Sequence, residues 1–171
     1  MKSIVIYSSL TGNTKQVAEA MTSVLPAGTP CVSMKEVPSD LSSYDLVFAG
    51  FWVDKGTANK EARDVLGTLH NPHIALFATA GVPPQMAHAK ESLINAANCL
   101  PDGVEPVGTF ICQGKVDPKV IEMMYKMFPK GHSHGQSADR DARHKQAAVH
   151  PNEDDFKAAQ EFAKDILIKL S

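Results

Sequence analysis

Cysteines and long apolar runs are scarce in this sequence, and each of these two scarcities excludes a class of protein. The 171 residues include three cysteines, and aromatic residues make up 6% of the chain. Three cysteines without metal-ligand spacing argue against a disulfide framework and favour reduced thiols, so we expect a cytoplasmic protein. No apolar run reaches the roughly 20 residues that span a bilayer, and Met1 leads almost directly into a predicted strand. We therefore expect no membrane association and no secretory signal.

An excess of charge of one sign is also lacking. The formal net charge is −2, from 17 Lys and Arg against 19 Asp and Glu. A balance this close predicts no attraction to nucleic acid or to an anionic membrane, and only weak electrostatic steering toward protein partners.

Short apolar runs alternate with stretches of helical periodicity along the chain. Strands that alternate with helices of 10 to 15 residues build parallel βαβ units, so we predict an α/β fold with a doubly wound sheet and helices on both faces. We expect residues 1–171 to form a single domain. The predicted strands are residues 3–7, 30–34, 44–52, 73–81 and 105–112. The predicted helices are residues 14–25, 57–69, 85–100 and a final helix capped by Asn152.

Residues 113–151 do not fit this plan, because they are far longer than an ordinary connection between a strand and a helix. Asp117 and Pro118 are a good cap and first residue for a helix over 119–128. We interpret the segment as an insertion that is partly helical again around 138–148.

The stretch SSLTGNT (8–14) places four hydroxyls and one glycine between the first strand and the first helix. The first N–H groups of a helix have no intrahelical partner, so an anion can bind there. Ser9, Thr11 and Thr14 could donate to a phosphate, while Gly12 lets the backbone approach closely. Neither the P-loop nor the dinucleotide fingerprint is present, which disfavours a nucleoside triphosphate or a Rossmann dinucleotide. The alternative is a helix-capping turn without a ligand.

This stretch resembles the phosphate loop of the flavodoxin family, whose pattern is [ST]-x-T-G-x-T. Ser9, Thr11, Gly12, Asn13 and Thr14 match the pattern, and Leu10 fills a position that contributes only its backbone. YDLVFAG (44–50) is similar to the family's third strand. The resemblance implies a flavodoxin-like sheet of five parallel strands in the order 2-1-3-4-5. It also implies that flavin mononucleotide (FMN) binds beyond the carboxyl ends of the strands.

The resemblance places the flavin ring on the loops that follow the third and fourth strands. GFWVDKGTANK (50–60) is the first loop, and Trp52 in it could stack on the ring or pack in the core. Lys55 could lie near the ring and raise its redox potential, or it could be a solvated loop lysine. The second loop, TAGVPP (79–84), lacks the tyrosine that often covers the outer face of the ring. The ring contacts expected from the two loops are Trp52, Val53, Lys55, Gly56, Thr57, Thr79, Ala80 and Gly81.

Other chemistry-bearing residues give weaker signals. His132 and His134 are two residues apart without a cysteine or a close carboxylate pair, so we predict no metal site. The cysteines are expected to pack as small apolar side chains, and no acid/base dyad or triad stands out, so no catalytic residue is predicted. Met123, Met124 and Met127 could form a partner surface or an ordinary buried stripe.

Three functions stay open, in order of preference. The first is an electron carrier that passes electrons from FMN to a redox partner protein. The second is an FMN-dependent NAD(P)H oxidoreductase acting on a quinone or a tetrapyrrole, and the third is a flavodoxin-shaped binding module with weak cofactor affinity. GFWVDKGTANK, CQGKVDPKVIEMM and RHKQAAVHPNEDDF resemble a subgroup of anaerobic bacterial flavodoxin-like proteins. Some members accompany bilirubin reductase, which implies an accessory role in electron delivery.

Overall fold

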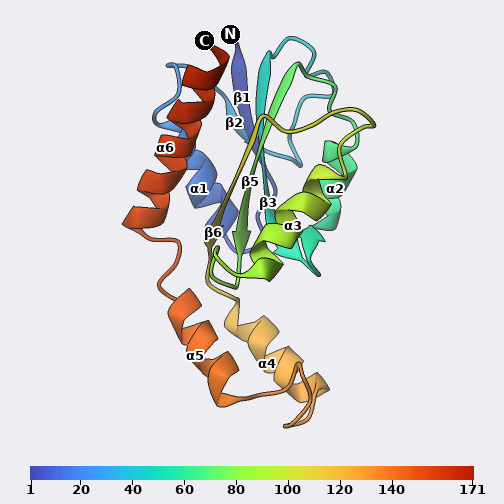
Figure 1. Ribbon diagram of the computed structural model, residues 1–171, viewed down its shortest axis with the longest axis vertical. Helices are drawn as coiled ribbons and strands as arrows, with labels where there is room; N and C mark the ends of the chain where they lie inside the picture. Colours follow the sequence, from blue (N-terminus) through green and yellow to red (C-terminus); the bar gives the residue numbers. More distant parts are fainter.

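A parallel sheet lies at the centre of the molecule, and helices cover both of its faces (Figure 1). The computed structural model describes residues 1–171. The strand order is β2-β1-β3-β5-β6, with the short strand β4 paired to β3. Since β4 is an addition at the end of β3, the predicted order of the five main strands is confirmed. The strands are β1 (Ser3–Tyr7), β2 (Cys31–Ser33), β3 (Leu46–Asp54), β4 (Thr57–Ala58), β5 (His73–Ala80) and β6 (Gly108–Gln113).

Six helices connect or follow these strands. None of them combines the length and the apolar character that crossing a bilayer requires. The helices are α1 (Asn13–Thr22), α2 (Lys60–Leu66), α3 (Ala87–Ala97), α4 (Pro118–Met127), α5 (Ala138–Ala147) and α6 (Glu153–Leu170).

The central strand β3 is apolar on both faces because both faces are covered. It pairs in parallel with β1 and β5, with Val47 opposite Ile74. Alternate side chains of a strand point to opposite faces. Val47 and Ala49 therefore join the core cluster under α2 and α3, while Phe48 joins the cluster under α1 and α6. Burying a side chain such as Phe48 contributes roughly 2 kcal/mol to stability.

β3 extends beyond its predicted end and folds back as a hairpin with β4. Asp54 pairs antiparallel with Thr57. Lys55 and Gly56 between them have φ values of 50° and 77°. Positive φ at both central residues defines a type I′ turn, whose twist matches the flanking strands. The predicted start of a helix at residue 57 is therefore wrong, because Thr57 and Ala58 bond to β3 and α2 begins at Lys60.

The last helix begins where its capping signal predicts. Oδ1 of Asn152 accepts hydrogen bonds from the N–H groups of Asp154 (3.1 Å) and Asp155 (3.3 Å). Oδ2 of Asp155 accepts in return from the N–H of Asn152 at 2.8 Å. This capping box satisfies N–H groups that a helix end leaves free. It fixes the start of α6, which packs beside α1 over the sheet (Figure 1).

Residues 115–150, here called the arm, project from the body beyond the carboxyl ends of the strands (Figure 1). The arm contains α4 and α5, which match the helices expected around 119–128 and 138–148. Polar contacts join them: the Tyr125 hydroxyl donates to Oδ1 of Asp141 and lies near Nδ1 of His144, both at 3.0 Å. Burial and the nearby Arg140 lower the pKa of His144, which keeps this imidazole neutral. α4 has no buried residue, so the arm adds little apolar burial to the fold.

Candidate functional site

One cavity of about 240 Å³ lies where the loops after β1, β3, β5 and β6 meet. This edge, beyond the carboxyl ends of the strands, is where open parallel α/β sheets bind ligands. The cavity is lined by Ser9, Leu10, Thr11, Asn13, Thr14, Trp52, Val53, Asp54, Thr79, Ala80, Gly81, Lys115, Val116, Asp117 and Val120.

Most of the residues expected to bind a cofactor line this cavity. The exceptions are Gly12, which completes the β1–α1 loop, and three residues of the β3–β4 hairpin, Lys55, Gly56 and Thr57. Lys55 is at the turn of the hairpin, and the Gly56 carbonyl accepts a hydrogen bond from Nδ2 of Asn95 on α3 at 2.8 Å. The flavin contacts expected of these residues stay predictions, since the cavity wall does not include them.

The β1–α1 loop leaves several backbone N–H groups free around the cavity. Gly12 turns the chain into α1 with a φ of 95°, and nothing lies within 4 Å of the position that a Cβ would take. The N-terminus of α1 adds the positive end of the helix dipole. The loop therefore forms a cradle for an anion, made mainly of backbone donors. The N–H groups without an intramolecular acceptor are those of Ser9, Leu10, Thr11, Asn13 and Thr14.

The hydroxyls of the loop divide between structural bonds and free donors. Ser9 Oγ accepts from the N–H groups of Gly12 (3.1 Å) and Lys15 (3.3 Å), so it caps α1 while its own proton stays free to donate. Thr14 Oγ1 lies 2.9 Å from Thr79 Oγ1, and both residues are buried. Thr11 makes no intramolecular side-chain bond. Ser9 thus holds the start of α1, while the remaining N–H groups of the loop have no acceptor within the protein.

A buried polar cluster holds the start of the loop against α2. The Ser8 hydroxyl donates to the Glu61 carboxylate and accepts from Nδ2 of Asn59 at 2.8 Å. Ser8 and Asn59 are both almost fully buried. Buried hydrogen bonds of this kind specify one conformation, because breaking them leaves unpaired polar atoms.

The connection between β6 and α4 supplies a wall whose residues were not among the contacts predicted from the sequence. Lys115, Val116 and Asp117 line the cavity there, together with Val120 on α4. Nδ2 of Asn13 donates to the Lys115 carbonyl at 2.9 Å, which ties this wall to the anion cradle. A signal for it was present, since these residues directly follow a parallel strand and so lie at the same edge of the sheet.

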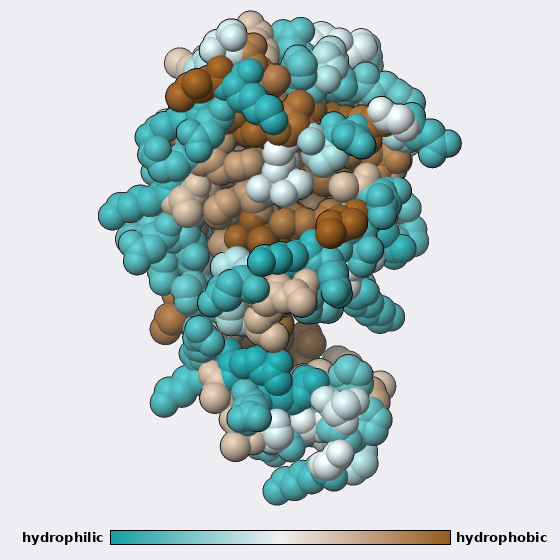
Figure 2. All heavy atoms as spheres, viewed as in Figure 1, coloured by the Kyte–Doolittle hydropathy of each residue, from teal (hydrophilic) through white to brown (hydrophobic).

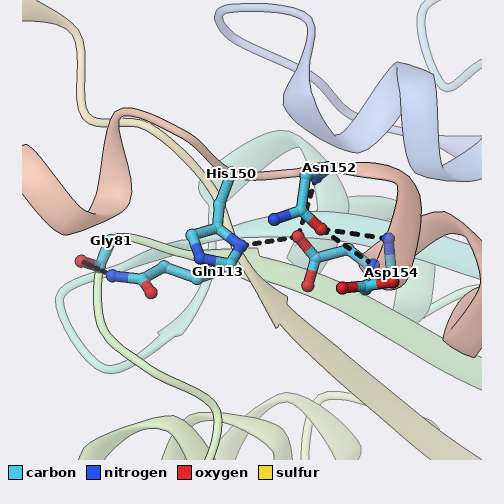
Figure 3. Close-up of polar contacts among 6 residues, drawn as sticks. Gly81, Gln113, His150, Asn152 and Asp154 are labelled. Atoms are coloured by element: carbon cyan, nitrogen blue, oxygen red, sulfur yellow. Dashed lines mark hydrogen bonds and ion pairs between the residues drawn. The ribbon is translucent and has the colours of Figure 1, made fainter.

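The two ends of the arm are bonded to each other and to the body. The Lys115 N–H donates to the His150 carbonyl at 2.8 Å. His150 Nδ1 lies 2.6 Å from Oδ2 of Asp155, the carboxylate of the capping box, as Figure 3 shows. Gln113 at the end of β6 donates from its Nε2 to the carbonyl of Gly81, a cavity residue, at 3.3 Å (Figure 3). The base of the arm is therefore part of the site.

The charged residues on the cavity wall are one cation, Lys115, and two carboxylates, Asp54 and Asp117. The nearby Cys112 is buried. Burial, with a smaller effect of the Asp155 carboxylate, raises the pKa of its thiol to about 12. A thiol that stays protonated is a poor nucleophile, so Cys112 acts as a packing residue. The histidines of the arm form no cluster of three or more metal-ligating side chains.

Comparison with known proteins agrees with this geometry. The family model of the flavodoxin domain matches residues 4–164. A flavodoxin-like domain-containing protein, BilS of Clostridioides difficile strain CD3, is 35% identical over 178 residues, covering 100% of this chain and 99% of that protein. The fold is similar to that of a flavodoxin from Streptococcus pneumonia TIGR4, with a TM-score of 0.58 and 14% identity over 99% of both chains. It is also similar to a flavoprotein in complex with FMN from Lactobacillus acidophilus NCFM, with a TM-score of 0.51 and 18% identity over 65% of this chain and 93% of that chain. Since the family model matches nearly the whole chain, the protein belongs to the flavodoxin domain family.

Proposed function

We propose that this protein binds FMN in the cavity and carries electrons from it to a redox partner protein. The observation that supports this most directly is the anion cradle of free N–H groups beside a cavity with apolar walls. FMN combines the two chemistries that such a site takes, a phosphate monoester and a flat, largely apolar ring. Membership of the flavodoxin family supports the choice of FMN.

The phosphate would lie in the cradle. A phosphate that leaves water needs hydrogen bonds to replace its hydration, and bonds to a charged acceptor are the stronger ones. The free N–H groups of the loop and the hydroxyls of Ser9 and Thr11 can donate these bonds. No cationic side chain is needed inside the loop, because the helix dipole favours negative charge there.

The ring would lie over the carboxyl ends of β3 and β5, against Trp52, Val53 and the Thr79–Gly81 segment, since Trp52 and Thr79 are paired neighbours in the sheet. A bound flavin supplies reversible electron transfer. The cavity, at about 240 Å³, is smaller than the roughly 300 to 1,000 Å³ of pockets that enclose a ligand. One edge of the ring would therefore stay at the surface, as electron transfer to another protein requires. The apolar side chains of Val53, Val116 and Val120 would exclude water from the rest of the flavin ring.

We further propose that a bilirubin reductase is a recipient of these electrons. The resemblance of three stretches of the sequence to the subgroup that accompanies that enzyme supports this role. We propose the cytoplasm as the location, where the three unpaired cysteines would stay reduced.

Absorbance spectra during anaerobic titration with FMN and then with dithionite test the proposal. We expect one FMN per chain and full, reversible reduction of the bound flavin. Asn13→Asp removes the donor to the Lys115 carbonyl and adds a negative charge beside the cradle. It should raise the Kd for FMN about 10- to 100-fold. Asn98→Asp makes the same change at the end of α3, away from the cradle, and should leave the Kd unchanged.

A colourless protein with a flat FMN titration would contradict the proposal and favour the binding-module alternative. Consumption of NAD(P)H by the purified, FMN-loaded protein alone would show instead that it is an oxidoreductase. An unchanged Kd in Asn13→Asp would show that the phosphate does not occupy the cradle.

A further inference from the structure

The arm and the body of this protein carry opposite net charge. Residues 115–150 contain seven Lys and Arg and four Asp and Glu, while the rest of the chain contains ten and fifteen. At pH 7 with neutral histidines, the arm is therefore +3 and the body is −5. The near-balance of the whole chain conceals this separation. An acidic protein is attracted to the arm and repelled by the body, so its approach is oriented.

The exposed face of α4 carries an apolar stripe with a cationic border. Val120, Met123 and Met127 are 43%, 59% and 67% exposed, and their spacing of three and four residues puts them on one side of the helix. Lys119 and Lys126 lie one turn before and one turn after Met123, so they border the stripe.

Met124 takes a different role from its neighbours. Its sulfur lies 3.8 Å from Nη1 of Arg140, between the two helices of the arm. The buried stripe does not form, since α4 has no buried residue: Met124 contacts α5, while Met123 and Met127 face outward. Methionine side chains adapt their shape to a partner, which suits transient docking.

The stripe continues into the cavity. Val120 is at once the first residue of the stripe and part of the cavity wall. Figure 1 shows α4 directly beyond the carboxyl ends of the strands. Figure 2 shows that the arm joins the body through a narrow neck, with a notch beside it at whose base apolar atoms are visible. A protein bound on the outer face of α4 would therefore also lie at the mouth of the cavity.

We propose that the exposed face of α4 is the docking site of a small acidic electron-carrier protein that reduces the bound flavin. This inference rests on the proposed function. In each encounter the metal centre of the carrier loses one electron and the flavin gains one, and protons come from solvent. The partner surface that fits is an apolar centre ringed by carboxylates, the complement of the stripe and its lysines.

The test uses the FMN-loaded protein and a reduced, acidic plant-type [2Fe–2S] ferredoxin as the probe, with flavin absorbance followed by stopped flow. We compare the double variants Lys119→Glu/Lys126→Glu and Met123→Gln/Met127→Gln with controls on α6. Lys157→Glu/Lys164→Glu matches the first, because it reverses two exposed lysines seven residues apart on α6, the spacing of Lys119 and Lys126 on α4. Ile168→Gln matches the second, because Ile168 is 70% exposed.

We expect each arm variant to lower the bimolecular rate constant by about tenfold or more, and the controls to change it by less than about twofold. The rate for the unaltered protein should fall as salt is added, because salt screens the steering charges. Equal rates for arm and control variants, or a rate that salt does not change, would overturn the docking site.

Two further measurements separate the possible failures. Failure of the unaltered protein to bind FMN would refute the proposed function itself. Normal FMN binding and normal reduction by dithionite, with arm variants as fast as controls, would refute only the docking site. The remaining candidate for binding to the exposed face of α4 is the acidic body of a second copy of this chain. Light scattering tests this candidate by measuring the oligomeric state. A dimer that the arm variants convert to a monomer would overturn the acidic carrier in favour of self-association.

Discussion

Ser9 Oγ accepts hydrogen bonds from the N–H groups of Gly12 and Lys15 at the start of α1, and its own proton is left without an intramolecular acceptor. Asn13 has two roles: it begins α1, and its Nδ2 donates a hydrogen bond to the carbonyl of Lys115, 102 residues away in the chain. The motif identified both residues by type. The partner of Asn13 could not be predicted, since no local pattern links two loops so distant in the sequence.

Cys112 should make the protein sensitive to alkaline pH. Burial raises the pKa of its thiol from the ordinary 9.0 to about 12, so the folded protein holds a proton that the unfolded chain releases above pH 9. This contribution to stability is fully present below pH 9 and is lost as the pH rises toward 12. We expect a loss of about 1 to 2 kcal/mol in the free energy of unfolding by pH 10.

Urea unfolding at pH 8 and pH 10 measures this loss. Cys112→Ala should be less stable at both pH values, because it leaves a small cavity, but it should lose less stability between them. Cys99→Ala, at a partly exposed thiol, should keep the full pH dependence. An identical pH dependence in Cys112→Ala and the unaltered protein would contradict the assignment.

Among the secondary-structure elements, the β3–β4 hairpin is the one that the local sequence pattern did not predict. Its two-residue turn is Lys55–Gly56. The lysine adopts a φ of 50°, which is unfavourable for a residue with a Cβ. The apolar spacing of residues 57–69 fits a helix, and that pattern extends through Thr57 and Ala58. Thr57 and Ala58 form a strand instead, because their pairing with β3 overrides a short helical pattern.

The strain at this turn can be relieved by one substitution. Asparagine tolerates positive φ, and Asn-Gly is the preferred sequence of a type I′ turn. Lys55→Asn should therefore raise the free energy of unfolding by about 0.5 to 1 kcal/mol. Lys60→Asn, at the exposed first turn of α2, should give no such gain. Urea denaturation of the two variants gives the comparison, and destabilisation by Lys55→Asn would show that the lysine side chain has a structural role in the hairpin.

The whole molecule consists of a core-forming body and an arm that is attached at its base. Neither core cluster contains a residue of the arm. The two ends of the arm meet where the Lys115 N–H bonds to the His150 carbonyl. The body therefore has its own core, while the cavity depends on residues from both parts.

Removal of residues 117–148, with a short Gly-Ser linker in their place, should leave a body that unfolds cooperatively. The free energy of unfolding should change by less than about 2 kcal/mol, because α4 buries no residue and α5 buries only Ala147. Affinity for FMN should fall, because Asp117 and Val120 leave the cavity wall. Circular dichroism during heating and an FMN titration measure the two effects. Loss of cooperative unfolding would show that the arm is part of the folding unit.

The sequence by itself determined the five main strands, most of the helices and the place of the hydroxyl loop between β1 and α1. Apolar periodicity, the Asn152 capping box and the hydroxyl loop each depend on residues that are close together in the chain, so their signals are local. Only the tertiary structure decided which loops share the cavity, and that Lys115 lies on its wall with its carbonyl bonded to Asn13. The physical reason is that these features arise where segments far apart in the sequence pack together at one edge of the sheet, and no local pattern encodes that contact.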